Sequence, residues 1–149
     1  MKPHVRPKEL EQKLIAHLRE KGYKLTQQRL EIIRILSQDT SHPGAVDILR
    51  KVREKSPQIS MSTVYYTLDM LKKEGLLREL EFYDRDNRYD ITVTDHINLI
   101  CKRCRKISDL SGELPVSAET VLNKTGFQPV GMRFEYYGYC KECRRKRAG

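Results

Sequence analysis

The chain has 149 residues, of which 38% are hydrophobic and 33% charged, and its formal net charge is +9. This length corresponds to one domain or two small ones, and no apolar run approaches the ~20 residues that a membrane span requires. Membrane proteins are thereby excluded and we expect a cytoplasmic location. The positive charge suits an anionic partner, above all nucleic acid, as well as it suits simple solubility.

The first half of the chain has the hydrophobic spacing of amphipathic helices. The expected inward faces carry Leu10, Leu14, Ile15 and Leu18, then Leu30, Ile33 and Leu36, then Ala45, Leu49 and Val52, and finally Val64, Leu68 and Leu71. Breaks follow at Gly22, at His42-Pro43, at Pro57 and at Gly75. Thr26 is a suitable N-cap for the second helix, and Ser60 and Ser62 are both candidates for the fourth.

After Gly75 the period changes from helical to alternating. Residues 76–82 and 88–93 read as two strands, and residues 84–87 as the turn between them. Short helices followed by a hairpin are the layout of a winged helix-turn-helix, in which a later helix enters the major groove of DNA.

The remaining residues predict a small α/β unit. We expect strands at 97–101 and 106–110, a helix at 115–124 with Pro115 in its first turn and Gly126 just past its end, and strands at 127–130 and 133–139. The basic run Arg144 to Arg147 is expected to be a disordered tail.

All four cysteines fall in two C-x-x-C pairs, Cys101 with Cys104 and Cys140 with Cys143, separated by 35 residues. In a reducing compartment, paired thiols of this spacing favour a metal site, and two short turns that supply two thiolates each suit one tetrahedral structural zinc. A redox pair and two disulfides are the alternatives. A redox motif needs only one C-x-x-C and usually opens a helix, whereas Cys101 ends a strand-like run.

The fourth helix carries the candidate DNA contacts. With the apolar stripe inward, Ser62, Thr63, Tyr65 and Tyr66 point outward near the start of the helix. Hydroxyls there can bind phosphates, and an exposed tyrosine ring can pack against a thymine methyl. The alternative is that one tyrosine packs on the wing. Lys24, before the second helix, could reach a minor groove or a phosphate, although most such lysines are only solvated.

These residues resemble a known family. The matching stretches are KLTQQR at 24–29, SHP at 41–43, STVYYTL at 62–68, TDH at 94–96, LICKRC at 99–104, and YGYC at 137–140 with Cys143. In order and spacing they are similar to the ferric uptake regulator family of bacterial metal-dependent transcription regulators, over about residues 8–145.

The resemblance implies an α+β fold with a winged-helix DNA-binding domain at 1–84, a wing end and hinge at 85–94, and a zinc-containing dimerisation domain at 95–149. It implies a homodimer that binds a palindromic operator in double-stranded DNA, with one structural Zn²⁺ per chain on the four cysteines. Tyr65 matches the base-contacting tyrosine of the family, and Lys24 matches its minor-groove lysine.

The resemblance also implies a regulatory metal site at His42, Asp90, His96, Asn98 and Asp109. Two imidazoles and two carboxylates suit Fe²⁺ or Mn²⁺, and also Zn²⁺. Asn98 stands where the family usually has a histidine, and its amide oxygen is a weaker ligand. Arg105 replaces the usual glycine after the first C-x-x-C, so it must either avoid a positive φ or adopt one at a cost.

The expected function is a metal-dependent transcriptional repressor that responds to peroxide or iron. Aspartates at positions 90 and 109 resemble the peroxide-sensing branch, in which His42 and His96 would be the oxidation targets. Alternatives are a zinc- or manganese-uptake regulator of the same family, a zinc-bound thiol redox sensor, and an architectural DNA-binding module without a regulatory metal. No nucleophile–base pair or phosphate loop supports an enzyme.

Overall fold

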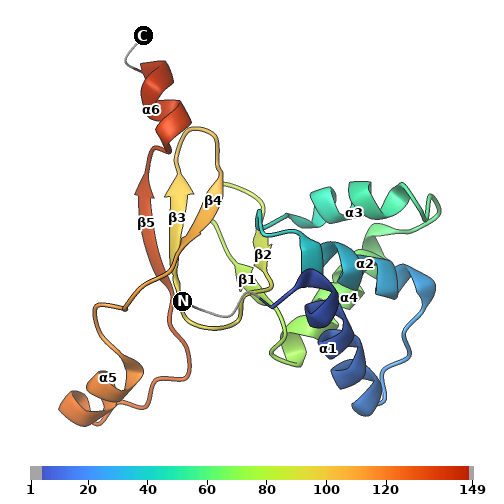
Figure 1. The fold of residues 1–149 in the computed structure, drawn as a ribbon, viewed down its shortest axis with the longest axis horizontal. Coiled ribbons are helices and arrows are strands. Elements are labelled where there is room, and N and C mark those ends of the chain that lie inside the picture. Colours follow the sequence, from blue (N-terminus) through green and yellow to red (C-terminus); the bar gives the residue numbers. More distant parts are fainter. Residues whose placement is uncertain (1–4, 148–149) are drawn as a thin grey trace. The chain divides into compact units, whose positions relative to one another are not determined.

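The computed structural model describes residues 5–147 and divides into two compact units, residues 1–93 and residues 94–149 (Figure 1). The outermost ends of the predicted domains, residues 1–4 and 148–149, lie outside the described residues. Across residues 5–147, the helices are all too short or too polar to cross a membrane.

The first unit consists of four helices followed by a hairpin. Its elements are α1 (Pro7–Glu20), α2 (Gln27–Gln38), α3 (Ala45–Arg53), α4 (Met61–Lys73), β1 (Arg78–Leu80) and β2 (Arg88–Asp90). The side chain of Thr26 accepts a hydrogen bond from the backbone N–H of Arg29 at 3.3 Å, and Ser60 accepts one from that of Thr63 at 3.2 Å. The N-cap predicted at Thr26 is confirmed, and of the two serines Ser60 caps α4.

One hydrophobic core holds these helices together. Every residue predicted for the inward faces of α3 and α4 is buried, and residues from all four helices are fully enclosed, including Leu18, Ile32, Leu36, Ile48 and Leu68. The core needs no contribution from the second unit, because the buried residues that form it lie between Leu14 and Tyr89.

The hairpin is shorter than the alternating pattern predicts. β1 and β2 pair antiparallel with Glu79 opposite Tyr89, over three residues each rather than 76–82 and 88–93. The second strand stops early because the Asp90 carboxylate accepts the backbone N–H of Thr92 at 2.8 Å, which closes a turn. The base of the hairpin is held by Glu79, which forms an ion pair with Lys72 and accepts the Tyr89 hydroxyl at 3.2 Å.

The second unit is a three-stranded sheet with two short helices. It consists of β3 (Ile97–Cys101), β4 (Ile107–Leu110), α5 (Ala118–Thr125), β5 (Phe134–Gly138) and α6 (Lys141–Arg147). The strand order is β4-β3-β5, with β3 antiparallel to β4 and parallel to β5, so β3 lies in the middle (Figure 1).

Three expectations for this unit are wrong. Residues 127–130 form no strand, and Phe127 and Val130 are exposed, because the sheet among the described residues offers them no partner. α5 begins at Ala118 because Ser117 caps it, accepting the Thr120 N–H at 3.1 Å, so Pro115 lies before the helix. The run from Arg144 to Arg147 lies in α6, which Cys143 anchors by its burial.

Candidate metal centres and DNA-binding surface

The four cysteines come together at one end of the second sheet. Cys101 ends β3, and Cys140 follows β5, its parallel neighbour in the sheet, so the two C-x-x-C turns start side by side. The four Sγ atoms lie within 4.8 Å of one another, with 3.7 Å between those of Cys104 and Cys140, and all four cysteines are free thiols. Four sulfurs at this separation can surround one tetrahedral ion.

Backbone groups favour the thiolate form of one member of this cluster, Cys101. The N–H groups of Cys104 and Cys140 point at the Cys101 sulfur, that of Cys140 from 3.4 Å, and they lower the pKa of the Cys101 thiol to about 6. A thiol with a lowered pKa is ionised at neutral pH, and the thiolate is the form that binds metals. Arg103 ties the two turns together by donating to the carbonyl of Cys143 at 3.4 Å.

The first turn contains a backbone strain. Arg105 has φ of 64°, so it does not avoid a positive φ but adopts the left-handed conformation. This conformation costs an L-residue about 1–2 kcal/mol relative to glycine. It persists because the turn is closed by hydrogen bonds from Arg105 N to Cys101 O at 3.0 Å and from Cys101 N to Lys106 O at 2.9 Å.

We expect Arg105→Gly to raise the free energy of unfolding of the second unit by up to about 1 kcal/mol, since relief of strain exceeds the added entropy of the unfolded chain. Thermal denaturation of the metal-loaded protein measures this. Lys106→Gly is the matched control, because it also removes a charge. Lys106 does not have a positive φ, so glycine there relieves no strain and should lower the stability of the second unit. A lower melting temperature for Arg105→Gly than for the wild type would contradict the expectation.

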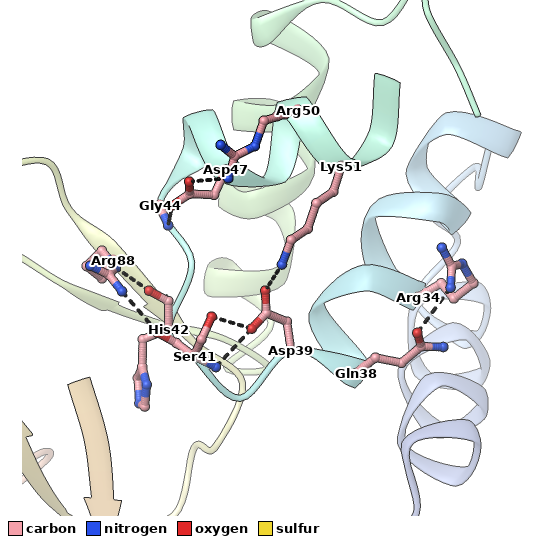
Figure 2. A network of polar contacts seen from close by, with 10 residues as sticks. All are labelled: Arg34, Gln38, Asp39, Ser41, His42, Gly44, Asp47, Arg50, Lys51 and Arg88. Carbon is pink, nitrogen blue, oxygen red and sulfur yellow. Dashed lines mark hydrogen bonds and ion pairs between the residues drawn. The ribbon is translucent and has the colours of Figure 1, made fainter. Parts of the chain in front are cut away.

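The loop before α3 is fastened to β2 by one guanidinium group. Arg88 donates to the backbone carbonyl of His42 and, at 3.0 Å, to that of Ser41 (Figure 2). The Tyr89 N–H donates to the carbonyl of Pro43 at 3.0 Å, and Gly44 bridges to Arg88. These contacts hold His42 at φ of 57°, a conformation that is uncommon outside glycine and that occurs most often where the surrounding structure enforces it.

His42 and Asp90 form a buried pair in the first unit. The imidazole Nε2 lies 3.3 Å from Asp90 Oδ2, and the two side chains are 2% and 4% exposed. Arg88 and Asp90 point to the same face of β2, because side chains alternate along a strand. One therefore positions the loop that carries His42 while the other contacts its ring.

His96, Asn98 and Asp109 gather in the second unit. His96 Nδ1 lies 2.7 Å from the carbonyl of Thr94, which favours a proton on Nδ1 and directs Nε2 toward Asp109 Oδ1, 3.5 Å away. Asn98 is paired with Asp109 across β3 and β4. Its buried Oδ1 has no hydrogen-bond partner among residues 5–147.

The predicted DNA contacts lie around the N-terminus of α4. Ser62, Tyr65 and Tyr66 are exposed, and Thr63 is partly exposed beside the capping Ser60. Lys24 is exposed in the loop before α2. The Arg29 guanidinium stacks on the Tyr66 ring at 4.3 Å and donates to the backbone carbonyl of Lys24 at 2.5 Å. One side chain therefore links the Lys24 loop with the exposed face of α4.

Arg88 and Arg29 were missed as positioning residues at the level of sequence. Arg88 could have been found, because it lies two residues from Asp90 on an expected strand and so shares its face. Arg29 had no such signal, because the α2–α4 packing that brings it to Tyr66 is a tertiary contact.

Residues 20–137 match the family model of the ferric uptake regulator family. The chain belongs to the ferric uptake regulator family. Among relatives, this family member is 37% identical over 133 residues to the peroxide-responsive repressor PerR of Staphylococcus epidermidis, covering 89% of each chain. It is 36% identical over 130 residues to the peroxide operon regulator of Bacillus subtilis, covering 87% of this chain and 90% of the relative.

Among solved structures, the ferric uptake regulator Fur of Helicobacter pylori matches with a TM-score of 0.73 and 26% identity, over 97% of each chain. That structure is described as having three functional metal-binding sites. The predicted α+β fold, with a winged helix-turn-helix followed by an α/β domain, is confirmed. This family member is a metal-dependent transcriptional repressor and not an enzyme.

Proposed function

We propose that this chain is a cytoplasmic, homodimeric repressor whose DNA affinity is set by one regulatory metal and lost on reaction with peroxide. Residues 1–84 are the DNA-binding domain, 85–94 the wing end and hinge, and 95–149 the zinc-containing dimerisation domain. The observation that carries the proposal is the pair of His–Asp contacts, His42 with Asp90 in one unit and His96 with Asp109 in the other.

Cys101, Cys104, Cys140 and Cys143 are proposed to hold the structural Zn²⁺. The close approach of the four free sulfurs and the lowered pKa of Cys101 support this assignment. Zinc bound by four thiolates has no open coordination position, which suits a structural rather than a sensing role.

The regulatory site is proposed to combine the two His–Asp pairs around one Fe²⁺ or Mn²⁺. Imidazole and carboxylate donors suit both ions. When His42, Asp90, His96 and Asp109 hold one ion together, the angle between the two units becomes fixed, and with it the spacing of the two α4 helices in the dimer. DNA affinity rises if the metal favours that arrangement over others.

Asn98 is proposed as a further, weak ligand. A buried amide oxygen without a hydrogen-bond partner costs about 1–3 kcal/mol, and coordination of a cation would offset this cost. The position of Asn98 opposite Asp109 supports the assignment.

We expect Asn98→His to tighten Fe²⁺ binding, by on the order of tenfold, because imidazole is a better ligand for this ion than an amide oxygen. Calorimetric titration of Fe²⁺ into the zinc-loaded protein under anaerobic conditions measures the change. Asn98→Leu, which keeps the branched shape and has no ligand atom, is the control and should weaken binding. Equal Fe²⁺ affinities in the three proteins would remove Asn98 from the ligand set.

The DNA contacts are proposed to come from Tyr65 at a thymine methyl, from Lys24 in the minor groove, and from Ser62, Thr63 and Tyr66 near the backbone. The exposure of these side chains around the α4 N-terminus supports this, since positive helix ends favour phosphate. A dimer with two such helices suits a palindromic operator.

Tyr65→Ala is expected to weaken specific binding to the protein's own promoter by about 1–3 kcal/mol, roughly 5- to 150-fold. Tyr65→Phe retains the ring and should bind within a few-fold of the wild type, if the contact is to a methyl group. Fluorescence anisotropy with thymine- and uracil-containing promoter fragments measures both. A wild-type protein that binds the two fragments equally would contradict the methyl contact.

The metal response tests the proposal as a whole. Promoter affinity is measured by anisotropy with Mn²⁺, with Fe²⁺ under anaerobic conditions, and with a chelator that leaves the zinc in place. Tighter binding with either metal is the expected result, and equal affinity in all three conditions contradicts the proposal.

Peroxide sensing has its own test. Peroxide added to the Fe²⁺ protein should release promoter DNA and add one oxygen atom, about 16 Da, to the peptide that contains His42 or His96. The Mn²⁺ protein, treated in the same way, is the control and should stay bound and unmodified. DNA release without histidine oxidation would leave a metal-responsive repressor of another kind.

A further inference from the structure

The positive charge of the second unit is concentrated around the cysteine cluster. Residues 101–106 and 139–147 contain nine basic residues and one acidic residue, a net charge of +8, whereas the rest of residues 94–149 contains two basic and five acidic residues. All nine are exposed, and together they are called the basic surface: Lys102, Arg103, Arg105, Lys106, Lys141, Arg144, Arg145, Lys146 and Arg147.

The fold joins two segments that are far apart in sequence into this basic surface. Lys102 N donates to the carbonyl of Gly138 at 2.8 Å, and Arg103 donates to that of Cys143 at 3.4 Å. Glu142 is exposed in the first turn of α6, between Lys141 and the basic residues Arg144 to Arg147. This one acidic residue therefore does not divide the basic surface.

The basic surface retains most of its charge when the cysteines are loaded. A zinc ion with four thiolates carries a formal charge of about −2, which leaves about +6. None of the basic side chains is needed for the zinc coordination proposed above. Like charges at this density repel one another and raise the free energy of the folded unit, so an anionic partner would relieve a real cost.

The chemistry of the basic surface indicates what the partner is. α6 has no apolar face, since its sequence between Lys141 and Arg147 is basic apart from Glu142 and the buried Cys143. Insertion into a membrane surface requires such a face. Protein interfaces are enriched in aromatic residues and depleted in lysine, and the only aromatic side chain here, Tyr139, is stacked under Arg147 at 4.8 Å. The remaining partner that suits this surface is the evenly charged phosphate backbone of a nucleic acid.

We propose that the basic surface of the second unit is a sequence-independent contact for the phosphate backbone of double-stranded DNA, separate from the α4 surface. This inference rests on the proposed DNA-binding function, and it extends that function to a unit otherwise assigned only to dimerisation and metal binding. Its effect is to raise affinity for all DNA, and thus the rate of encounter with an operator, without adding specificity.

The test uses the full, zinc-loaded chain and a duplex that lacks the operator. In one variant Arg144→Gln, Arg145→Gln and Lys146→Gln are combined; in a second, Lys102→Gln is combined with Lys106→Gln, so that the result does not depend on α6 alone. The matched control combines Lys8→Gln, Lys13→Gln and Arg19→Gln on α1, where the same number of charges is removed. Zinc content and melting temperature confirm that each variant is folded.

The slope of log affinity against log salt concentration is the readout. Removing one phosphate-binding charge lowers the magnitude of this slope by about 0.9, so the α6 triple variant should lower it by up to about 2.7 for each protomer whose basic surface contacts the duplex, and the control should not. Slopes equal to the wild type in both variants, or an equal fall in the control, would overturn the inference. The inference would also be overturned if the variants bound anionic phospholipid vesicles or a polyglutamate peptide more weakly than the wild type while their DNA slope stayed unchanged. That result would favour a membrane or an acidic protein as the partner.

The same proteins are titrated on the promoter with and without Mn²⁺. If the wild type binds the promoter in a metal-dependent way and the variants have the wild-type salt slope, the proposed function stands and the DNA contact of the basic surface is overturned. If the variants have reduced salt slopes and promoter binding by the wild type does not depend on the metal, the DNA contact of the basic surface stands and the proposed metal response is contradicted.

Discussion

Cys140→Ser is expected to release zinc and unfold the second unit while the first unit stays folded. The second unit has a small core: among residues 94–147, the buried hydrophobic side chains are Ile97, Ile100, Cys101, Ile107 and Cys143, and two of these five are proposed zinc ligands. So small a core needs a further stabilising element. In zinc-finger peptides, structural zinc contributes about 10–16 kcal/mol to the free energy of folding. The first unit has its own core and does not depend on the metal.

Zinc content and amide hydrogen exchange measure this outcome. Protection should be lost in β3, β4 and β5 and retained in α1 to α4. Cys140→His is the matched control, because three thiolates and one imidazole also form a stable tetrahedral site. It should recover much of the zinc and of the protection. A serine variant that keeps one zinc per chain and a protected β3 would remove the structural role assigned to the cluster.

His96→Ala is expected to abolish the metal response of DNA binding without unfolding the protein. Couplings between metal and DNA sites are typically about 1–3 kcal/mol, or 5- to 150-fold in affinity, and the ratio of affinities with and without Mn²⁺ should fall to near one. His96 carries this effect because its Nδ1 is held by the carbonyl of Thr94, which aims Nε2 at the position where a metal shared with Asp109 would lie.

Promoter binding by anisotropy at saturating and zero Mn²⁺ gives the ratio. His17→Ala is the matched control, since His17 is also a histidine paired with a carboxylate, Glu74 at 3.3 Å, but is partly exposed and belongs to α1. It should keep the metal response. A His96→Ala protein with the wild-type ratio would favour a DNA-binding module without a regulatory metal.

Much of the first unit could be predicted from its sequence, because its signals are local. The caps Thr26 and Ser60 and the apolar stripes of α3 and α4 depend on neighbours a few residues away. The second unit was less predictable where structure depends on a distant partner. Alternation at 127–130 favoured a strand that no neighbouring strand completes among the described residues, and the charge of Arg144 to Arg147 concealed a helix that the burial of Cys143 stabilises.

The candidate sites divide in the same way. The C-x-x-C spacing alone indicated the cysteine cluster, because each half is made within four residues. Strand alternation could have shown that Arg88 shares a face with Asp90, but not that it would hold His42 in a left-handed conformation. The stacking of Arg29 on Tyr66 had no signal in the sequence, since this contact also joins elements far apart in the chain. The pairings of His42 with Asp90 and His96 with Asp109 were anticipated only through the family resemblance.

The parallel pairing of β3 with β5 has a consequence for how the chain matures. Ile97 is opposite Phe134, so the central strand must wait for 37 further residues before its second neighbour exists, and long-range strand pairing of this kind is slow compared with helix formation. Cys140 and Cys143 come later still. The helical unit is therefore expected to be complete on the growing chain before the second unit can take up zinc, so that metal loading acts as a late step of maturation.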